Sequence, residues 1–207
     1  MSRPLVVGVI GGVASGKSEV TRTLESLGAF VIHADPIGHE VLREPEVIAE
    51  LLTRFPASIV DASTGQIDRT RVADLVFGDS TVAVDNRRFL EGVVHPRIRS
   101  RIREHLRRLQ EQGSHPVIVL DVPLLLESAW DSMCDRILFV DAAREDRLAR
   151  ARKRGWSVED FERREQSQWP LDQKRTEASD ILDNRGSLEE LQDQVSRWWQ
   201  RHVDTAG

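Results

Sequence analysis

The residue types with the clearest chemical use stand near the N-terminus, in the run Gly11-Gly12-Val13-Ala14-Ser15-Gly16-Lys17-Ser18. The run fits the pattern G-x-x-x-x-G-K-S/T, in which glycines let backbone N–H groups approach phosphate oxygens. In that pattern the Lys17 ammonium reaches the β- and γ-phosphates, and the Ser18 hydroxyl takes one position on Mg²⁺. The run therefore predicts a site for the phosphates of a nucleoside triphosphate.

The segments on either side of this loop have the periodicities that the motif requires. Residues 5–10 form a short apolar run, as expected of a parallel strand buried on both faces. After the loop, Val20, Leu24 and Leu27 recur at helical spacing. The helix would point its positive dipole end at the phosphates. The alternative, a glycine-rich turn with a chance Lys-Ser pair, is disfavoured by this context.

Two further apolar runs are followed by carboxylates. Asp35 comes after residues 29–32, and Asp121 comes after residues 117–120. Because ligands of α/β sheets bind at the carboxyl ends of the strands, both residues are expected to face the phosphates. Asp121 then fits a Mg²⁺ ligand, often through water. Asp35 fits a base that orients an attacking hydroxyl and accepts its proton, and a helix N-cap before Pro36 is its other interpretation.

The middle of the chain has helical periodicity without a strong strand. Helices are expected over 36–54 with a break at Pro45, over 71–77, over 86–94 and over 97–112. His95-Pro96 is expected to end a helix, because the residue before proline avoids helical dihedrals. Considered by itself, His95 is interpreted as a capping or packing residue and not as a ligand-binding one. The arginines of the last helix fit a solvated basic face, and the sharper hypothesis is that one or two contact a substrate phosphate.

The C-terminal part predicts strands at 136–140 and 180–183. Between them lies a cationic helix ending near Gly155, where a mobile arginine-bearing flap over the triphosphate is expected. A solvated helix is the alternative for any single arginine. Ser187 and Glu190 predict a capping box for a final helix whose inner face holds Leu188, Leu191, Val195, Trp198 and His202.

Composition describes an ordinary globular protein of 207 residues with a net charge of −5. An acidic balance argues against broad nucleic-acid binding. The single Cys134 predicts a buried, inert thiol. No signal peptide or membrane-length apolar run is visible, so a cytoplasmic location is the expectation.

With these pieces in place, the chain resembles the dephospho-CoA kinase family nearly from end to end. Residues 8–18 resemble the family motif G-x-T-G-G-I-G-S-G-K-S, and Ala34-Asp35 resembles the second half of its motif D-A-D. His95-Pro96 matches the motif H-P, and residues 123–127 match P-L-L-x-E. Residues 168–175 resemble Q-x-P-L-x-x-K-R, and residues 183–187 resemble D-N-x-G-S. The first motif is shared by many families. The later motifs, in this order, are the specific part.

The resemblance implies an α/β P-loop kinase fold over residues 1–207, with a doubly wound parallel sheet of about five strands. A helical CoA-binding lobe at 36–97 and a lid at 150–174 would be insertions in it. The implied reaction is ATP-dependent phosphorylation of the ribose 3′-hydroxyl of dephospho-CoA, with Mg²⁺. The implied partners are the small molecules ATP and dephospho-CoA, with no nucleic acid and no membrane, and the chain would be a monomer or a weak homo-oligomer.

Carried over residue by residue, the resemblance implies the following roles: catalysis by Asp35, Lys17 and Arg154; ATP binding by Gly11, Gly12, Val13, Ala14, Ser15, Gly16, Lys17 and Ser18, with Asn184 near the adenine; substrate binding by Asp35, His95 and Glu127; and metal binding by Ser18 and Asp121.

Four positions depart from the family pattern. His33 replaces the first Asp of D-A-D, His39 replaces a frequent Arg, and Ile10 replaces the usual Thr. Lys153-Arg154-Gly155 stands for R-x-G, which leaves open the arginine that meets the phosphates. Another small-molecule kinase, acting on a nucleoside or nucleotide, is the second hypothesis. A nucleotide switch related to GTPases is disfavoured because no N-K-x-D stretch follows a late strand.

Overall fold

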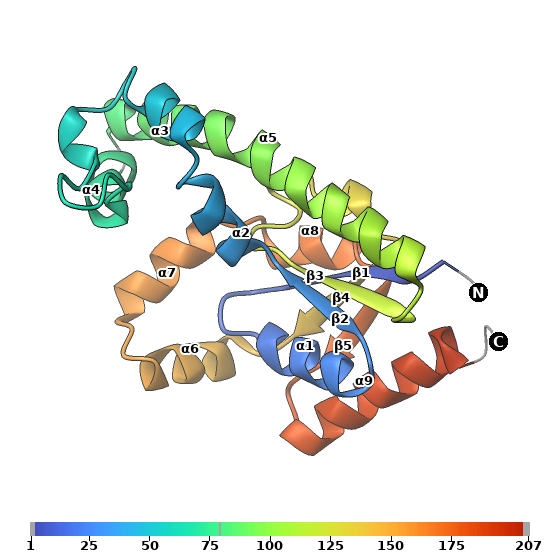
Figure 1. Ribbon diagram of the computed structural model, residues 1–207. Coiled ribbons are helices and arrows are strands. Elements are labelled where there is room, and N and C mark those ends of the chain that lie inside the picture. Colours follow the sequence, from blue (N-terminus) through green and yellow to red (C-terminus); the bar gives the residue numbers. More distant parts are fainter. Residues whose placement is uncertain (1–2, 79, 205–207) are drawn as a thin grey trace. The chain divides into compact units, whose positions relative to one another are not determined.

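The computed structural model describes residues 3–78 and 80–204. Its centre is a parallel sheet of five strands in the order β2-β3-β1-β4-β5 (Figure 1). The strands are β1 (Leu5–Gly11), β2 (Phe30–His33), β3 (Val117–Asp121), β4 (Arg136–Asp141) and β5 (Asp180–Asp183). The predicted α/β fold with a parallel sheet of this size is confirmed.

The first strand lies in the middle of the sheet. Val7 of β1 pairs with Val119 of β3 on one side and with Arg136 of β4 on the other. A central strand is covered on both faces, which explains why β1 and β3 are almost continuously apolar. The same pairing brings the carboxyl end of β3, with Asp121, beside the end of β1 where the glycine-rich loop begins.

Helices cover both faces of the sheet, as predicted for a doubly wound fold. Helices α1 (Lys17–Ser26) and α9 (Leu188–His202) pack on one face, and α8 (Leu171–Thr176) contacts β1 from the other (Figure 1). The core on the first side includes Leu24, Leu191, Trp198 and Trp199. The two tryptophans are therefore packing residues. Leu188, expected on the inner face of α9, is instead exposed because it stands in the first turn.

The predicted capping box at the start of α9 is confirmed. Ser187 Oγ accepts the Glu190 backbone N–H at 3.1 Å, and Glu190 Oε2 accepts the Ser187 N–H at 2.7 Å. Helices α6 (Arg144–Lys153) and α7 (Val158–Gln166) follow β4, and Gly155 between them has a φ of 79°, which suits glycine at a helix end. Burial raises the pKa of the Cys134 thiol to about 12, as expected for an inert cysteine.

The described residues divide into two compact units, of which Ala34–His105 is one. This unit contains α2 (Ala34–Val41), α3 (Pro45–Leu51), a short 3₁₀ helix (Ala57–Ile59), α4 (Arg69–Val76) and most of α5 (Thr81–Gln112). Among its described residues, the only β-type pairing is an isolated antiparallel bridge between Val60 and Ile67. The sheet and all other described helices belong to the second unit.

The helix end predicted at His95-Pro96 is wrong, and the alternative interpretation of Asp35 as an N-cap is not met. Helix α5 does not stop at His95-Pro96 but continues through Pro96. The proline removes one backbone hydrogen bond, yet Val93 and Ile98 are buried on either side, and the Arg97 guanidinium donates to the Val93 carbonyl at 2.7 Å. Helix α2 begins at Ala34, so Asp35 lies inside the first turn and not at the N-cap.

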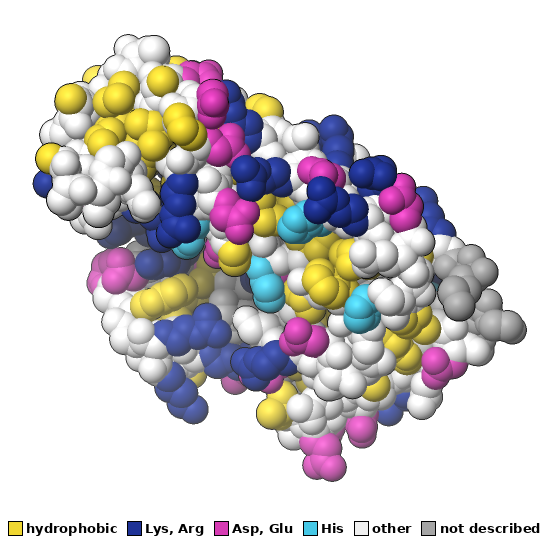
Figure 2. Space-filling view, in the orientation of Figure 1, with side chains coloured by type: hydrophobic (Ala, Val, Ile, Leu, Met, Phe, Trp, Pro, Cys, Tyr) yellow, Lys and Arg dark blue, Asp and Glu magenta, His cyan; other side chains and the backbone are white. Residues whose placement is uncertain are grey.

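Two arginines of α5 are held by acidic partners within the Ala34–His105 unit. Arg97 pairs with Glu50 at 2.9 Å, and Arg101 pairs with Glu40 at 3.0 Å and Glu44 at 2.5 Å. Figure 2 shows basic and acidic side chains interspersed over α5. Arg97 and Arg101 are therefore paired with carboxylates of their own unit, and the contact of an α5 arginine with a substrate phosphate stays a hypothesis. Among the described helices, none combines the length and the apolar character of a membrane span.

Candidate active site

The glycine-rich loop connects the end of β1 to the start of α1, as the motif requires. Gly16 precedes the helix with a φ of 103°, a conformation that non-glycine residues rarely adopt. A Cβ added to Gly16 would collide with the Asn184 amide nitrogen, and one added to Gly12 would lie 2.8 Å from Arg147 Nη1. The backbone of the loop is thus closely enclosed. Glycine is needed at position 16 for its dihedral angle and for space, whereas a side chain at position 12 would require the Arg147 guanidinium to shift.

Lys17 is folded onto the loop that it follows. Its Nζ donates to the carbonyl oxygens of Gly11 at 3.2 Å and Gly12 at 3.0 Å. The pKa of Lys17 is lowered to about 8, mainly by burial and also by the nearby cations Lys174 and Arg154, while Asp121 and Glu127 act in the opposite direction. An ammonium group with depressed pKa and weak neutral acceptors is well suited to receive phosphate oxygens.

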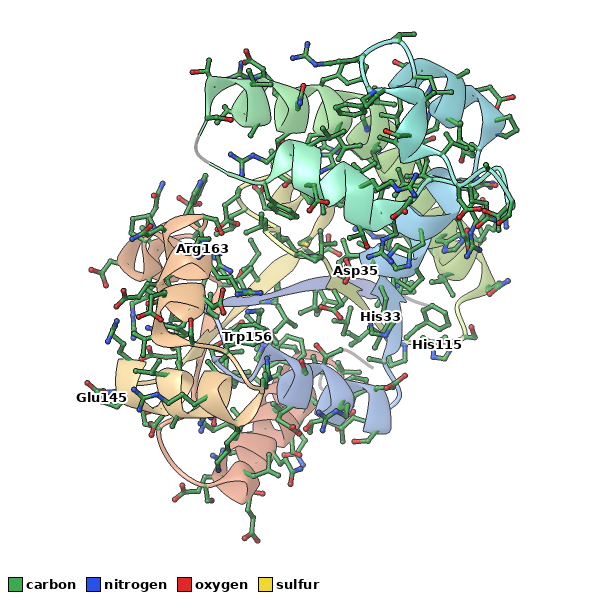
Figure 3. All side chains as sticks on the ribbon, turned by 90° about the vertical axis from the view of Figure 1, so that its left-hand side faces the viewer. His33, Asp35, His115, Glu145, Trp156 and Arg163 are labelled. Atoms are coloured by element: carbon green, nitrogen blue, oxygen red, sulfur yellow. The ribbon has the colours of Figure 1, made fainter. Side chains whose placement is uncertain are left out.

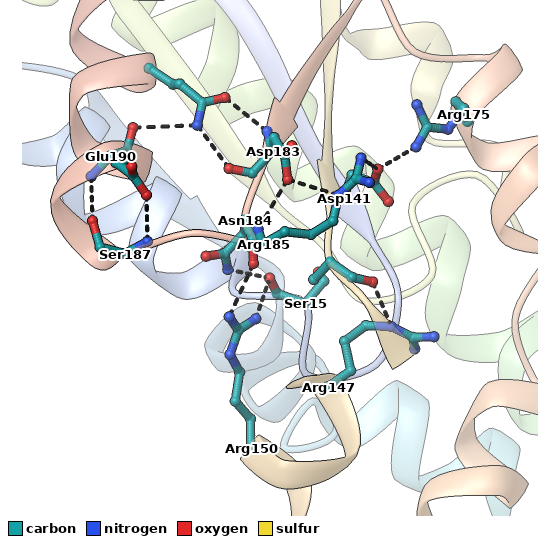
Figure 4. Close-up of polar contacts among 12 residues, drawn as sticks. Ser15, Asp141, Arg147, Arg150, Arg175, Asp183, Asn184, Arg185, Ser187 and Glu190 are labelled. Atoms are coloured by element: carbon teal, nitrogen blue, oxygen red, sulfur yellow. Dashed lines mark hydrogen bonds and ion pairs between the residues drawn. The ribbon is translucent and has the colours of Figure 1, made fainter. Parts of the chain in front are cut away.

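The Ser15 carbonyl is held from two sides. Asn184, only 5% exposed, donates through Nδ2 at 2.6 Å, and Arg150 Nη1 donates at 3.2 Å (Figure 4). Arg150 Nη2 also donates to the Asn184 carbonyl at 3.2 Å. Asn184, predicted near the adenine, therefore supports the phosphate loop directly. Arg150 was not singled out from the sequence, because it is one of many arginines on α6.

The Asn184 position is itself anchored by a charged cluster at the ends of β4 and β5. Asp141 accepts from Arg185 at 2.9 Å and also pairs with Arg175 (Figure 4). The Asn184 backbone N–H donates to the Asp141 carbonyl at 2.7 Å. The D-N-x-G-S segment is thereby tied to β4, next to the strand that carries the phosphate loop.

Asp121 and Ser18 are the predicted metal ligands. Asp121 ends β3 and is paired in register with His33, whose Nδ1 lies 2.9 Å from Asp121 Oδ2 (His33 is labelled in Figure 3). Ser18 is exposed in the first turn of α1. No group of three or more acidic, His or Cys residues in the described chain forms a complete metal site. Ser18 and Asp121 would suit Mg²⁺ nevertheless, because this ion commonly binds one or two protein oxygens together with substrate phosphates.

Glu127 forms hydrogen bonds with the C-terminal end of the predicted lid. Its Oε1 accepts from Lys174 Nζ and from the Trp169 backbone N–H, both at 2.8 Å, while Lys174 also donates to Gln168 at 2.9 Å. Burial alone would raise the pKa of Glu127, but these hydrogen bonds outweigh it and the pKa lies below its ordinary value. Lys174 belongs to the motif of residues 168–175, where the sequence pattern assigned it no role.

Arg147 forms a second buried ion pair beside the loop. It is 3% exposed, pairs with Glu165 of α7 and donates to the Val13 carbonyl at 3.5 Å. A small cavity of about 120 Å³ lies next to it, lined by Gly12, Val13, Glu165, Gln168, Trp169, Pro170 and Leu171. A nucleotide needs a site of roughly 300 Å³ or more, so this cavity is not a nucleotide pocket.

Arg154 and the nearby turn are the exposed part of the predicted lid. Arg154 follows α6, and its guanidinium makes no hydrogen bond or ion pair with any other residue that the structure describes. Trp156 lies in the turn before α7 (Figure 3), where Arg164 stacks 4.1 Å from its ring centroid. The Arg154 guanidinium is therefore available to a ligand.

The remaining predicted residues, Asp35 and His95, belong to the Ala34–His105 unit. Asp35 lies in the first turn of α2, two residues beyond the end of β2. His95 is half-buried in α5, and burial lowers its pKa below the ordinary value. Their roles stay predictions from the family resemblance.

The parallel sheet and the loop that joins β1 to α1 define the class of P-loop kinases, with Lys17 in the loop and Asp121 on the neighbouring strand. Within that class, residues 5–190 match the family model described as dephospho-CoA kinase. The chain belongs to the dephospho-CoA kinase family.

Comparisons with individual proteins agree. The chain is 40% identical to the dephospho-CoA kinase of Rhodopirellula baltica over 188 residues, covering 90% of this chain and 85% of that protein. The Thermus thermophilus enzyme of the same name is 36% identical over 190 residues, which cover 91% of this chain and 87% of that protein. A crystal structure of a Thermus thermophilus protein superposes with a TM-score of 0.78 at 34% identity, and the superposition covers 97% of this chain and 99% of that one. The fold alone is also shared with dephospho-CoA kinase from Campylobacter jejuni, with a TM-score of 0.66 at 22% identity, covering 98% and 100%.

Proposed function

We propose that the chain transfers the γ-phosphoryl group of ATP to the ribose 3′-hydroxyl of dephospho-CoA, which gives coenzyme A and ADP. The observation that carries this proposal is the match to the dephospho-CoA kinase family over residues 5–190, which includes the phosphate loop and the later motifs. Relatives at 34–40% identity bear the same name. A nucleoside or nucleotide kinase of the same fold is not favoured by these matches.

The phosphate loop would bind the triphosphate through its backbone N–H groups and Lys17. On binding, the Lys17 ammonium would exchange its hydrogen bonds to the Gly11 and Gly12 carbonyls for bonds to phosphate oxygens. The Ser15 peptide is already held by Asn184 and Arg150, so little of the loop has to reorganise. Preorganisation of this kind strengthens the stabilisation of charge that develops on the transferred group.

Ser18 and Asp121 would hold Mg²⁺, which neutralises charge on the β- and γ-phosphates when it is bound. The hydrogen bond between His33 and Asp121 restricts the rotation of the carboxylate. The first Asp of the family's D-A-D motif is absent here, and His33 supplies a hydrogen-bonding group at that position.

Asp35 would orient the 3′-hydroxyl and accept its proton. Its position along the chain supports this role: it is the second residue after His33, so the two Cα atoms lie within roughly 7 Å of each other. His33 itself pairs with Asp121 across the sheet. Asp35 is therefore near the carboxyl edge of the sheet whatever the placement of the rest of its unit.

Arg154 would close over the phosphates from the lid, residues 150–174. An exposed guanidinium without a protein partner in the described chain can move to a ligand without breaking an existing ion pair. Closure would exclude water, which limits wasteful hydrolysis of ATP. Residues 36–97 would form the lobe that binds CoA, with His95 and Glu127 on the substrate side.

Release of ADP, measured in a coupled assay with dephospho-CoA as the acceptor, tests this proposal. The same assay with nucleosides and nucleotides tests the second hypothesis. We expect turnover with dephospho-CoA and background rates with the other acceptors. Background rates with dephospho-CoA, together with turnover of a nucleoside, would refute the proposed substrate. The cytoplasmic location and the monomeric or weakly oligomeric state stay predictions.

A further inference from the structure

The tip of the phosphate loop, Val13-Ala14, has a strained backbone conformation. Ala14 has a φ of 57°, in the left-handed region that residues other than glycine rarely adopt. The motif that residues 8–18 resemble has glycine at this position, so the chain departs from the motif here as well. A strained conformation of this kind persists only where the surrounding structure enforces it. The residues packed around Ala14 therefore have to supply that constraint.

The loop tip packs against helices α6 and α7. Val13 and Ala14 are buried in one apolar cluster with Ala151 of α6 and Phe161 of α7. Helix α7 lies within the predicted lid, residues 150–174, so the loop tip and the lid share a small core. Apolar contacts are not directional, so they hold the tip in place without orienting its peptide planes.

The directional contact comes from Arg147, which is 3% exposed. Its Nη1 donates a weak hydrogen bond to the Val13 carbonyl at 3.5 Å, and its Nε donates to the Ala142 carbonyl at 3.3 Å. The same guanidinium forms the buried ion pair with Glu165 of α7. The position that a Cβ on Gly12 would take is only 2.8 Å from Nη1. The lid helices thus hold a charged group directly against the backbone of the loop.

This contact orients a peptide that faces the phosphates. In a planar trans peptide the carbonyl oxygen and the N–H point to opposite sides. Arg147 at the Val13 carbonyl therefore turns the Ala14 N–H away from the guanidinium. Asn184 holds the Ser15 carbonyl of the same loop in the same manner, at 2.6 Å. Because the backbone N–H groups of such a loop bind the phosphates, donors on its carbonyl oxygens leave those N–H groups available to the ligand.

We propose that Arg147, paired with Glu165, is a positioning residue of the phosphate site: it holds the Val13–Ala14 peptide in the strained conformation that receives the phosphates. This inference rests on the proposed binding of ATP at the loop. Arg147 acts through the loop backbone and does not itself contact the phosphates. Without this anchor Ala14 relaxes out of the left-handed region, and the strained conformation has to be regained whenever ATP binds.

The test is the dissociation constant of ATP, measured by calorimetry without dephospho-CoA, together with the thermal unfolding temperature. The variant Arg147→Met/Glu165→Met replaces both charges by apolar side chains, a change that is often neutral or stabilising for a buried ion pair. We expect an unfolding temperature equal to or above that of the wild type. ATP binding should nevertheless be about tenfold weaker, because a residue other than glycine regains the left-handed conformation at about that cost.

Two further variants show whether the pair acts through the backbone of the loop tip. Ala14→Gly, added to the double variant, should restore the dissociation constant to within about threefold of the wild type, because glycine adopts the left-handed conformation without strain. Glu165→Gln alone keeps the shape of the pair and an oxygen that accepts from Arg147. It should weaken ATP binding less than the double variant does, by about threefold.

Arg144→Met is the matched control for charge. Arg144 lies on α6 like Arg147, and it pairs with Glu162 and Glu165 of α7 at 2.8 and 3.9 Å. Its substitution removes the same positive charge from the same helix, together with ion pairs that join α6 to α7. The side chain is half exposed, and we expect the dissociation constant of ATP to change by less than about twofold.

Weaker ATP binding without a loss of stability, relieved by Ala14→Gly, supports the proposal. Unchanged ATP binding in the double variant would overturn it. A loss that Ala14→Gly does not relieve, or that Arg144→Met shows to the same extent, would overturn it as well and would assign the pair a packing or general charge role. Because dephospho-CoA is absent, failure of the proposed acceptor leaves these results readable. Failure of the wild type to bind ATP at all would instead refute the assignment of the loop, and the inference with it.

Discussion

ATP binding should be accompanied by the uptake of a proton, and Lys17 should be its acceptor. Without nucleotide, burial and the charges of Lys174 and Arg154 lower the pKa of Lys17 from 10.5 to about 8. Its hydrogen-bond acceptors are then only the neutral carbonyls of Gly11 and Gly12. When phosphate oxygens replace them, full negative charges favour the ammonium form and the pKa of Lys17 rises.

The expected size of this uptake depends on pH. A group with a pKa of about 8 is half protonated at pH 8, so complete protonation on binding takes up about 0.5 proton per ATP. The same arithmetic gives about 0.1 proton at pH 7 and about 0.9 at pH 9, provided that the pKa in the complex stays above about 10. ATP itself contributes little above pH 8, because the second pKa of a terminal phosphate lies near 6.

Calorimetric titration with ATP, in buffers that differ in ionisation enthalpy, measures the number of protons directly. The slope of the observed enthalpy against the buffer enthalpy is the uptake per ATP. Lys17→Arg is the matched control, because an arginine keeps its charge throughout this range and can still contact phosphate. We expect the control to bind ATP with less than about 0.1 proton at each pH.

A pH-independent uptake between pH 7 and pH 9 would refute the reasoning, as would an uptake below about 0.1 proton at pH 8. Equal uptake in Lys17→Arg would show that another group accepts the proton. The assay needs no acceptor substrate, so turnover does not complicate it.

Three other variants test the site. Lys17→Met should lose most turnover. Below pH 8 it should also raise the free energy of unfolding by up to about 3 kcal/mol, because the buried ammonium no longer has to be desolvated. This gain in stability should fade as the pH rises from about 8 to 10.5, and urea unfolding at pH 7 and pH 10 measures it. Asp35→Asn should lower kcat by roughly 10²–10⁴-fold with unchanged ATP affinity, and near-normal turnover would remove Asp35 as the base. Asn184→Ala should weaken ATP binding about tenfold, because the Ser15 carbonyl loses its shorter hydrogen bond, whereas equal affinity would limit Asn184 to a structural role.

The sequence by itself determined the features that depend on neighbouring residues. The phosphate loop, the strands around it and the capping box at Ser187 follow from local periodicity and turn chemistry, which act over a few residues. The order of motifs from Gly11 to Ser187 was enough to indicate the family. Local rules failed at Pro96, where buried side chains on both sides keep α5 continuous against the preference of the proline.

Only the tertiary structure decided which side chains meet across long stretches of chain. Asn184 reaches the carbonyl of Ser15 although 169 positions separate them, and Glu127 meets Lys174 from a different element. Such contacts are set by strand order and by the packing of helices on the sheet, and no spacing in the chain encodes them. Burial then changes the chemistry: a lysine that any motif would describe as a simple cation acquires a pKa near 8 because water is excluded and a second lysine lies close by.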